Sequence, residues 1–362
     1  MTNSISEKQL AIITGTGFTL TKLYIMPAFL SNISESALWV SAFINVIIDY
    51  FLLIFILKVI RNLKNQKLFN AIENSSSNKF AKVIFLFYAV FFIFKAFTPI
   101  VEQKNSIELT VYETQPTLLT FMPFFVVAFY ILLKGFRPFG RSYETCLWIY
   151  IFGMGSIVLL SVFAGDYTSL LPIIPENPLK ILEGSLRSLI WFGDPIYILF
   201  FAGYIEKSSQ NLKRVKSAYI ISSISTIFIL MLFYAVFDSI APRQYYATLK
   251  MSKYSIALSN IGRFDYISAF MLAATSVFQV CLPLLLANMC LNDCFEFKSK
   301  FVSPFIIISL EIAFAILTEH TFISSINFMS KYLVYFFIIM TYILPILLYY
   351  LFGRKKHEIQ TC

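Results

Sequence analysis

The stretch Phe192-Gly193-Asp194-Pro195 interrupts a long apolar run near residues 185–205. Glycine is conformationally permissive, and proline removes a backbone donor and disrupts the helix around it. An aspartate inside hydrocarbon costs at least about 2.5 kcal/mol, so its presence there needs a structural or functional reason. The stretch therefore predicts a membrane-crossing helix that is broken about midway.

The composition places such apolar runs in a bilayer. The 362 residues are 58% hydrophobic and only 14% charged, with a mean hydropathy of +0.74, whereas a soluble chain carries about 25% charged residues. This excludes a soluble enzyme and a nucleic-acid-binding domain. Five scattered cysteines are too few for a disulfide framework. We expect membrane lipid, and no nucleic acid, to surround the chain.

Apolar runs bounded by polar clusters predict the membrane helices. A crossing takes about 20 residues, and runs of that kind occur about ten times. The chain is thus expected to be an all-α polytopic membrane protein with a single transmembrane domain over residues 1–362. The expected spans cover residues 8–30, 36–58, 82–100, 117–134, 145–165, 185–205, 217–238, 265–291, 302–319 and 328–352.

Lys and Arg residues are distributed unevenly between the two sets of connecting segments. If the N-terminus lies inside, the cytoplasmic set carries more than twice as many of them as the opposite set. Cytoplasmic loops of membrane proteins collect basic residues. We therefore expect both termini in the cytoplasm and an even number of spans.

A second weak point lies in the first span. Thr14-Gly15-Thr16-Gly17 combines two glycines with two hydroxyl residues, and Lys22 follows at about mid-membrane. The interrupted spans would then be the first helices of two five-helix halves, about 8–165 and 185–352. Broken helices at corresponding positions are typical of transporters with inverted repeats. For Gly15 and Gly17 taken alone, close helix packing is an equally good explanation.

Broken helices create a candidate binding site. Their free N–H and C=O groups are tolerated only in the protein interior or along a cavity, where they can hold the carboxylate or ammonium of a solute. Lys22 and Asp194 are expected to form either a structural bridge or part of this cavity, with Lys22 in the place of a coupling cation. For polar residues on the eighth span, an interhelical hydrogen bond is the alternative. The candidate substrate-binding residues are Gly15, Thr16, Gly17, Lys22, Phe192, Gly193, Asp194, Tyr197, Ser276 and Gln279.

Three further ionisable residues fall within spans, namely Asp49, Lys95 and Glu311. Asp49 and Lys95 are candidates for a mutual pair. Glu311 is either a proton-responsive acid or a buried, hydrogen-bonded residue. The sequence contains no pattern of catalytic residues, metal ligands or a phosphate-binding loop, so we expect no catalytic site, no metal and no cofactor.

Several short motifs resemble the spore germination permease family, the B-type subunits of nutrient germinant receptors in the amino acid–polyamine–organocation transporter superfamily. Ile5-Ser6-Glu7-Lys8-Gln9 resembles the family's Ile-Ser-x-x-Gln opening, and Gly17 and Pro27 match its first-helix glycine and proline. Leu170-Leu171-Pro172 and Gly184 resemble its external loop. Phe192-Gly193-Asp194 resembles its Phe-Gly-Glu motif, with the carboxylate one methylene shorter.

The resemblance implies a leucine-transporter-like five-plus-five fold with broken helices one and six. It also implies a subunit that senses a small nutrient, often an amino acid, in the spore inner membrane, together with A-type and C-type receptor subunits. A proton-coupled amino acid transporter of the vegetative cell membrane is the main alternative. A polytopic membrane enzyme is disfavoured, since such enzymes usually need histidines or paired acids in large external loops.

Overall fold

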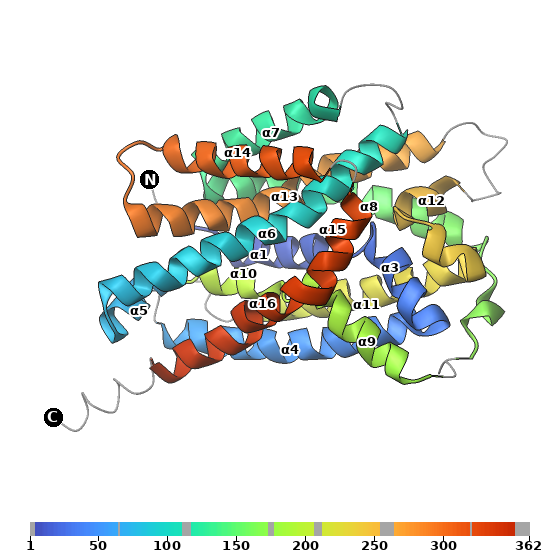
Figure 1. Cartoon of the computed structure of the whole chain (residues 1–362), viewed down its shortest axis with the longest axis horizontal. Helices are drawn as coiled ribbons and strands as arrows, with labels where there is room; N and C mark the ends of the chain where they lie inside the picture. Colours follow the sequence, from blue (N-terminus) through green and yellow to red (C-terminus); the bar gives the residue numbers. More distant parts are fainter. Residues whose placement is uncertain are drawn as a thin grey trace.

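The computed structural model is a bundle of helices, most of which run along its long axis (Figure 1). It describes residues 4–63, 66–110, 117–172, 177–205, 212–253, 264–318 and 321–351. Ten helical segments of this part of the chain correspond to the ten predicted spans. The fold class predicted from the sequence is therefore confirmed.

The first span is a broken helix. It begins with α1 (Glu7–Ile12), which is capped by Ser6, whose hydroxyl accepts from the Gln9 N–H at 3.3 Å. A π-helical turn (Ile13–Gly17) and α2 (Phe18–Leu20) continue it, and a non-helical stretch over residues 21–25 follows. The second half is α3 (Met26–Ser34). Pro27 lies in its first turn, where a backbone N–H would have no partner within the helix, so the missing N–H of proline costs nothing.

The break in this helix lies later than the sequence predicted. Gly15 and Gly17 lie within the π-helical turn, so the helix continues through them. The chain leaves the helix only at residues 21–25, which include Lys22. The expectation of a break at Gly15–Gly17 was wrong, because the backbone stays helical there and Gly17 serves close packing. A Cβ on Gly17 would lie 2.8 Å from the Tyr143 hydroxyl, whereas one on Gly15 would lie 3.5 Å from the Ala218 Cβ, an ordinary contact distance.

The next four spans complete the first half of the chain. They are α4 (Leu38–Asn62), α6 (Asn78–Thr110), α7 (Thr117–Lys134) and α8 (Phe136–Val162), with a short α5 (Leu68–Ser75) between α4 and α6. Helix α6 extends about ten residues past its predicted end at residue 100. Its extension buries Glu102 and Lys104, which the sequence had placed in a connecting loop.

The sixth span is broken where the sequence predicted. Helix α9 (Leu179–Ser188) begins six residues before the predicted start and ends in a short 3₁₀ turn (Leu189–Trp191). A non-helical link over residues 192–194 leads to α10 (Pro195–Phe200), which has Pro195 in its first turn. Gly193 has φ +81°, a left-handed conformation that glycine adopts without steric cost.

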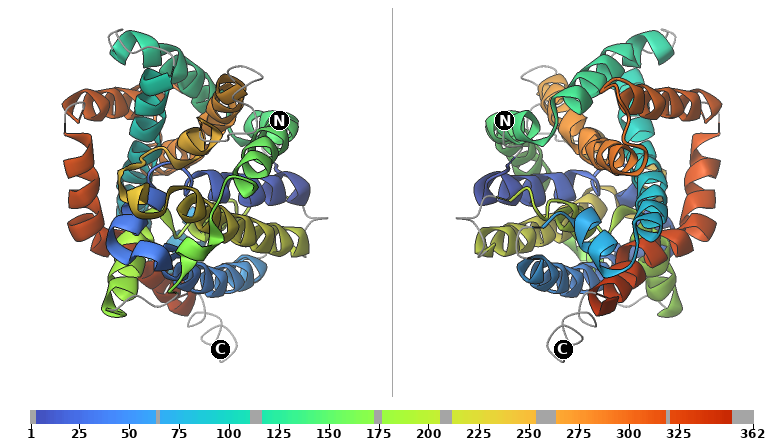
Figure 2. Two further views of the ribbon diagram at one scale, coloured as in Figure 1. Left: turned by 90° about the vertical axis from the view of Figure 1, so that its right-hand side faces the viewer. Right: turned by 90° about the vertical axis from the view of Figure 1, so that its left-hand side faces the viewer.

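The remaining spans are α11 (Lys213–Phe237), α13 (Phe264–Phe295), α14 (Val302–Leu317) and a last helix that begins with α15 (Phe322–Phe328), includes α16 (Val334–Ile338) and runs to Leu351. A short α12 (Ala247–Lys253) lies between α11 and α13. Helices α6 and α13 pack along each other, and the broken helices lie beside them (Figure 2).

The outer surface suits a bilayer. Six helices of the described residues are long and apolar enough to cross one, and the shorter apolar helices Phe121–Lys134 and Val302–Leu317 add to them. Large apolar side chains such as Phe51, Trp148 and Phe163 are 66%, 74% and 80% exposed. Large apolar side chains exposed in this number match lipid rather than water.

Candidate functional site

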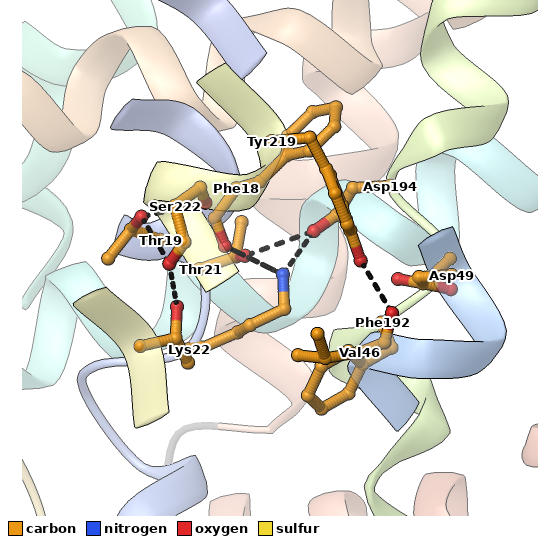
Figure 3. A network of polar contacts seen from close by, with 12 residues as sticks. Phe18, Thr19, Thr21, Lys22, Val46, Asp49, Phe192, Asp194, Tyr219 and Ser222 are labelled. Carbon is orange, nitrogen blue, oxygen red and sulfur yellow. Dashed lines mark hydrogen bonds and ion pairs between the residues drawn. The ribbon is translucent and has the colours of Figure 1, made fainter. Parts of the chain in front are cut away.

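The breaks in helices one and six meet inside the bundle. The ammonium of Lys22 donates to the Asp194 carboxylate and, at 2.6 Å, to the carbonyl oxygen of Phe18 (Figure 3). The side chains of Lys22 and Asp194 are 6% and 0% exposed. Thr21 adds a contact from its hydroxyl to Asp194 at 3.5 Å. The two breaks are thus joined by a buried ion pair.

The Lys22 side chain satisfies a backbone carbonyl that the break in helix one leaves without its helical partner. The backbone N–H of Lys22 donates to the Thr19 carbonyl at 3.0 Å instead of continuing the α-helical pattern to Phe18. The Phe18 carbonyl is satisfied by the Lys22 ammonium and by the Thr21 hydroxyl at 3.1 Å. Buried carbonyls need such partners, since an unpaired one costs about as much as a lost hydrogen bond.

Two further charged residues hold the break in helix six. Both carboxylate oxygens of Asp49, on α4, accept from the Gly193 N–H, at 3.1 and 2.9 Å. The ammonium of Lys95, on α6, donates to the carbonyl of Ile190 at 2.9 Å and to that of Phe192. Side chains from α4 and α6 therefore hold the link of residues 192–194 in place by hydrogen bonds to its backbone.

These four residues form one neutral cluster, which we call the charge tetrad: Lys22, Asp49, Lys95 and Asp194. Each is at most 6% exposed. The Lys95 nitrogen lies 3.5 Å from Asp194 Oδ1, and the Tyr342 hydroxyl donates to Asp49 at 2.6 Å. Two cations and two anions balance each other, which buried charges require. The suggested mutual pair of Asp49 and Lys95 is not what forms, because each instead binds the break in helix six.

Aromatic side chains enclose the tetrad. The Lys22 ammonium lies 5.0 Å from the ring centroid of Phe192, within cation–π range. Tyr197 is buried one turn after Asp194, edge-on to Phe18 with a centroid distance of 6.0 Å. Tyr219, on α11, also meets Phe18 edge-on and donates to the Val46 carbonyl at 3.2 Å. These rings exclude water and strengthen the electrostatic interactions within the site.

The described side chains of the other residues selected from the sequence make no hydrogen bond to the tetrad. Thr16 donates to the Ile12 carbonyl at 2.8 Å and lines a cavity of about 10 Å³ beside Tyr143. Gln279, on α13, is buried, and its side-chain amide has no hydrogen-bond partner among the described residues. Ser276 lies on the same helix, and its side chain is outside the described part.

Sequence reasoning left Asp49 and Lys95 out of the site. The signal that could have included them was their position as ionisable residues within predicted spans. Glu311 is a different case. It is 0% exposed on α14, and neither of its oxygens has a hydrogen-bond partner among the described residues, so the hydrogen-bonded alternative for it is not observed.

The fold has the leucine-transporter architecture, as the solved structures similar to it show. A mutant of the manganese transporter of Eremococcus coleocola gives a TM-score of 0.63 at 14% identity, over 93% of this chain and 78% of that one. A sodium-coupled sialic acid symporter gives 0.55 at 12% identity, over 92% and 78%. Residues 5–323 match the spore permease family, described as spore germination protein, and the chain belongs to that family. No curated protein matches it in sequence.

The comparisons define a multi-pass, permease-like membrane protein. Both the family and the structural neighbours are permeases and transporters rather than enzymes. The neighbours' titles name a manganese transporter and a sialic acid symporter, two unlike cargoes. The shared fold therefore leaves the ligand to be argued from this chain's own residues.

Proposed function

We propose that this chain is the nutrient-sensing, permease-like subunit of a spore germinant receptor, and that a small nutrient, an amino acid, binds between the breaks of helices one and six. The observation that carries the proposal is the convergence of both breaks on the buried charge tetrad. In transporters with broken helices, solutes bind to the backbone groups that the breaks expose.

The tetrad offers the same chemistry as an amino acid. The Lys95 ammonium donates to carbonyls of the break in helix six. The Asp49 carboxylate accepts from the Gly193 N–H. An amino acid carries one ammonium and one carboxylate. It can therefore take the place of these side chains at the same backbone groups without changing the net charge of the buried site.

Binding of this kind moves the half-helices that meet at the tetrad. A solute shifts the population of conformations only by its differential affinity for them. In our proposal the shift is passed to an A-type membrane subunit and a lipoprotein C-type subunit in the spore inner membrane, with both termini of this chain in the cytoplasm. The proposal assigns the chain sensing, and it does not require net movement of solute.

The test uses spores in which this chain is the sole B-type subunit. Asp194→Asn keeps the size of the side chain but removes the charge that binds Lys22, so the amino acid concentration needed for half-maximal germination should rise at least tenfold. Asp238→Asn, at an exposed aspartate after α11, is the matched control. A normal response from Asp194→Asn spores, at equal membrane abundance by immunoblot, would remove the main support of the proposal.

The transporter fold of the neighbours favours a second candidate, a proton-coupled amino acid transporter of the vegetative cell membrane. Uptake of labelled amino acids into proteoliposomes under a pH gradient separates the two. Saturable uptake above that of empty liposomes supports transport. Binding without uptake supports the sensor.

A further inference from the structure

Glu311 is a carboxyl group in the protein interior that the proposed function does not use. On α14 it belongs to a stripe of buried residues at every fourth position, which are Ser303, Ile307, Glu311 and Ala315. Residues four apart share one face of an α-helix, so this stripe faces protein rather than lipid. Glu311 is 0% exposed, and neither of its carboxyl oxygens has a hydrogen-bond partner among the described residues.

The helices around Glu311 offer no charge that balances an ionised carboxylate. Helices α6, α7 and α13 pack against α14 (Figure 1). On α7, the described titratable side chains Tyr130 and Lys134 are exposed. The buried titratable side chains described on the other two helices are Tyr88, Lys95, Glu102, Lys104, Cys281, Cys290 and Cys294. Glu311 forms no hydrogen bond with any of them. A buried carboxylate without a partner is strongly unfavourable, so the carboxyl group is neutral in this conformation.

Aromatic contacts connect the Glu311 region of α14 with α6. Phe314, three residues after Glu311, lies 5.9 Å from Phe94 and 5.7 Å from Phe97, measured between ring centroids. Lys95 lies between these two phenylalanines in the sequence, and its ammonium holds the break in helix six. A displacement of α14 would therefore disturb the segment of α6 on which that break depends.

Ionisation of Glu311 requires such a displacement. A carboxylate is stable only where water or a cation solvates it, and the surroundings of Glu311 in the packed arrangement are protein. We propose that Glu311 is a proton-binding site that couples pH to the break in helix six. The protonated form stabilises the packed arrangement. Release of the proton to water favours an opened arrangement in which α14 has moved away from α6. The inference is independent of the solute proposed above.

The sign of the pH dependence follows from the neutral carboxyl group of the packed arrangement. Opening releases one proton, so a rise in pH favours opening, by at most about tenfold per pH unit. The test measures hydrogen exchange of a peptide that covers residues 189–196, in the full chain in lipid nanodiscs, and compares variants at the same pH. Glu311→Gln has no proton to release. From about pH 5 to about pH 8, exchange in the unaltered chain should therefore accelerate at least tenfold relative to this variant.

Two further variants control the measurement. Glu296→Gln makes the same change at a glutamate whose side chain is 73% exposed, so it should exchange as the unaltered chain does. Glu311→Leu also lacks an ionisable group and should show the same weak pH dependence as Glu311→Gln, which separates loss of the proton from an effect of the amide.

Two outcomes would overturn the inference. One is an equal pH dependence of exchange in the unaltered chain and in both Glu311 variants. The other is an effect of pH that depends on Glu311 but leaves the exchange of residues 189–196 unchanged, since the carboxyl group would then not act on the break in helix six.

Discussion

Substitution of Gly193 by alanine tests how the break in helix six is held. Its φ of +81° is costly for any residue with a Cβ, by about 1–2 kcal/mol. The new Cβ would also lie 2.5 Å from the Cγ2 of Thr341, and overpacking of this kind costs about 1–3 kcal/mol. We therefore expect Gly193→Ala to lower the free energy of unfolding by about 2–5 kcal/mol, the sum of the two effects.

The assay is reversible unfolding in mixed micelles followed by circular dichroism. Gly155→Ala is the control, because a Cβ on Gly155 meets nothing within 4 Å. A double-mutant cycle with Thr341→Ala separates the two costs, since that change removes the clash but not the backbone strain. The cycle should recover about 1–3 kcal/mol. Two results would refute the description of this break. One is an equal free energy of unfolding for Gly193→Ala and Gly155→Ala, and the other is the absence of coupling between Gly193→Ala and Thr341→Ala.

Three other perturbations have defined outcomes. Lys22→Met leaves Asp194 buried beside Lys95 alone and should destabilise the chain by about 3–5 kcal/mol in the same unfolding assay, with partial recovery when Asp194→Leu is added. Gly184→Ala would place a Cβ 2.1 Å from the Ser34 hydroxyl, so it should cost about 1–3 kcal/mol, and Ser34→Ala should restore much of that loss; an unchanged Gly184→Ala protein would contradict the close packing of α9 on α3. Because the Lys22 ammonium stands where we expect a coupling cation, replacing sodium by choline should leave nutrient-triggered germination unchanged, and a sodium requirement would contradict that role.

The break in helix six could be predicted because its cause is local. Gly193 supplies a conformation that other residues avoid, and Pro195 starts the next half-helix. The break in helix one has no glycine within residues 21–25. Its sequence signal is Pro27, which occupies the first turn of α3 as Pro195 does that of α10. Gly15 and Gly17 instead lie within a continuous helical turn, where Gly17 allows close packing against Tyr143, so glycine content alone indicated the wrong position for the break.

The tetrad could be predicted only in part. An ionisable side chain inside the membrane costs free energy, so each one within a predicted span can be identified as structurally or functionally important. The pairing of Lys22 with Asp194 follows because both lie about midway along broken spans. The partners of Asp49 and Lys95 do not follow, because their distances to helix six depend on how α4 and α6 pack against it. The 33 residues of α6 also exceed the crossing length, and residues 101–104, beyond its predicted end, are buried in protein.

The most direct measurement is a structure of the chain in nanodiscs with the amino acid that raises its unfolding temperature most among the twenty common ones. We expect density for that amino acid between residues 18–25 and 190–194, with its ammonium on carbonyls now held by Lys95 and its carboxylate near the Gly193 N–H. No stabilising amino acid, or one bound elsewhere with the tetrad unchanged, would contradict the proposal that solutes bind where the broken helices meet.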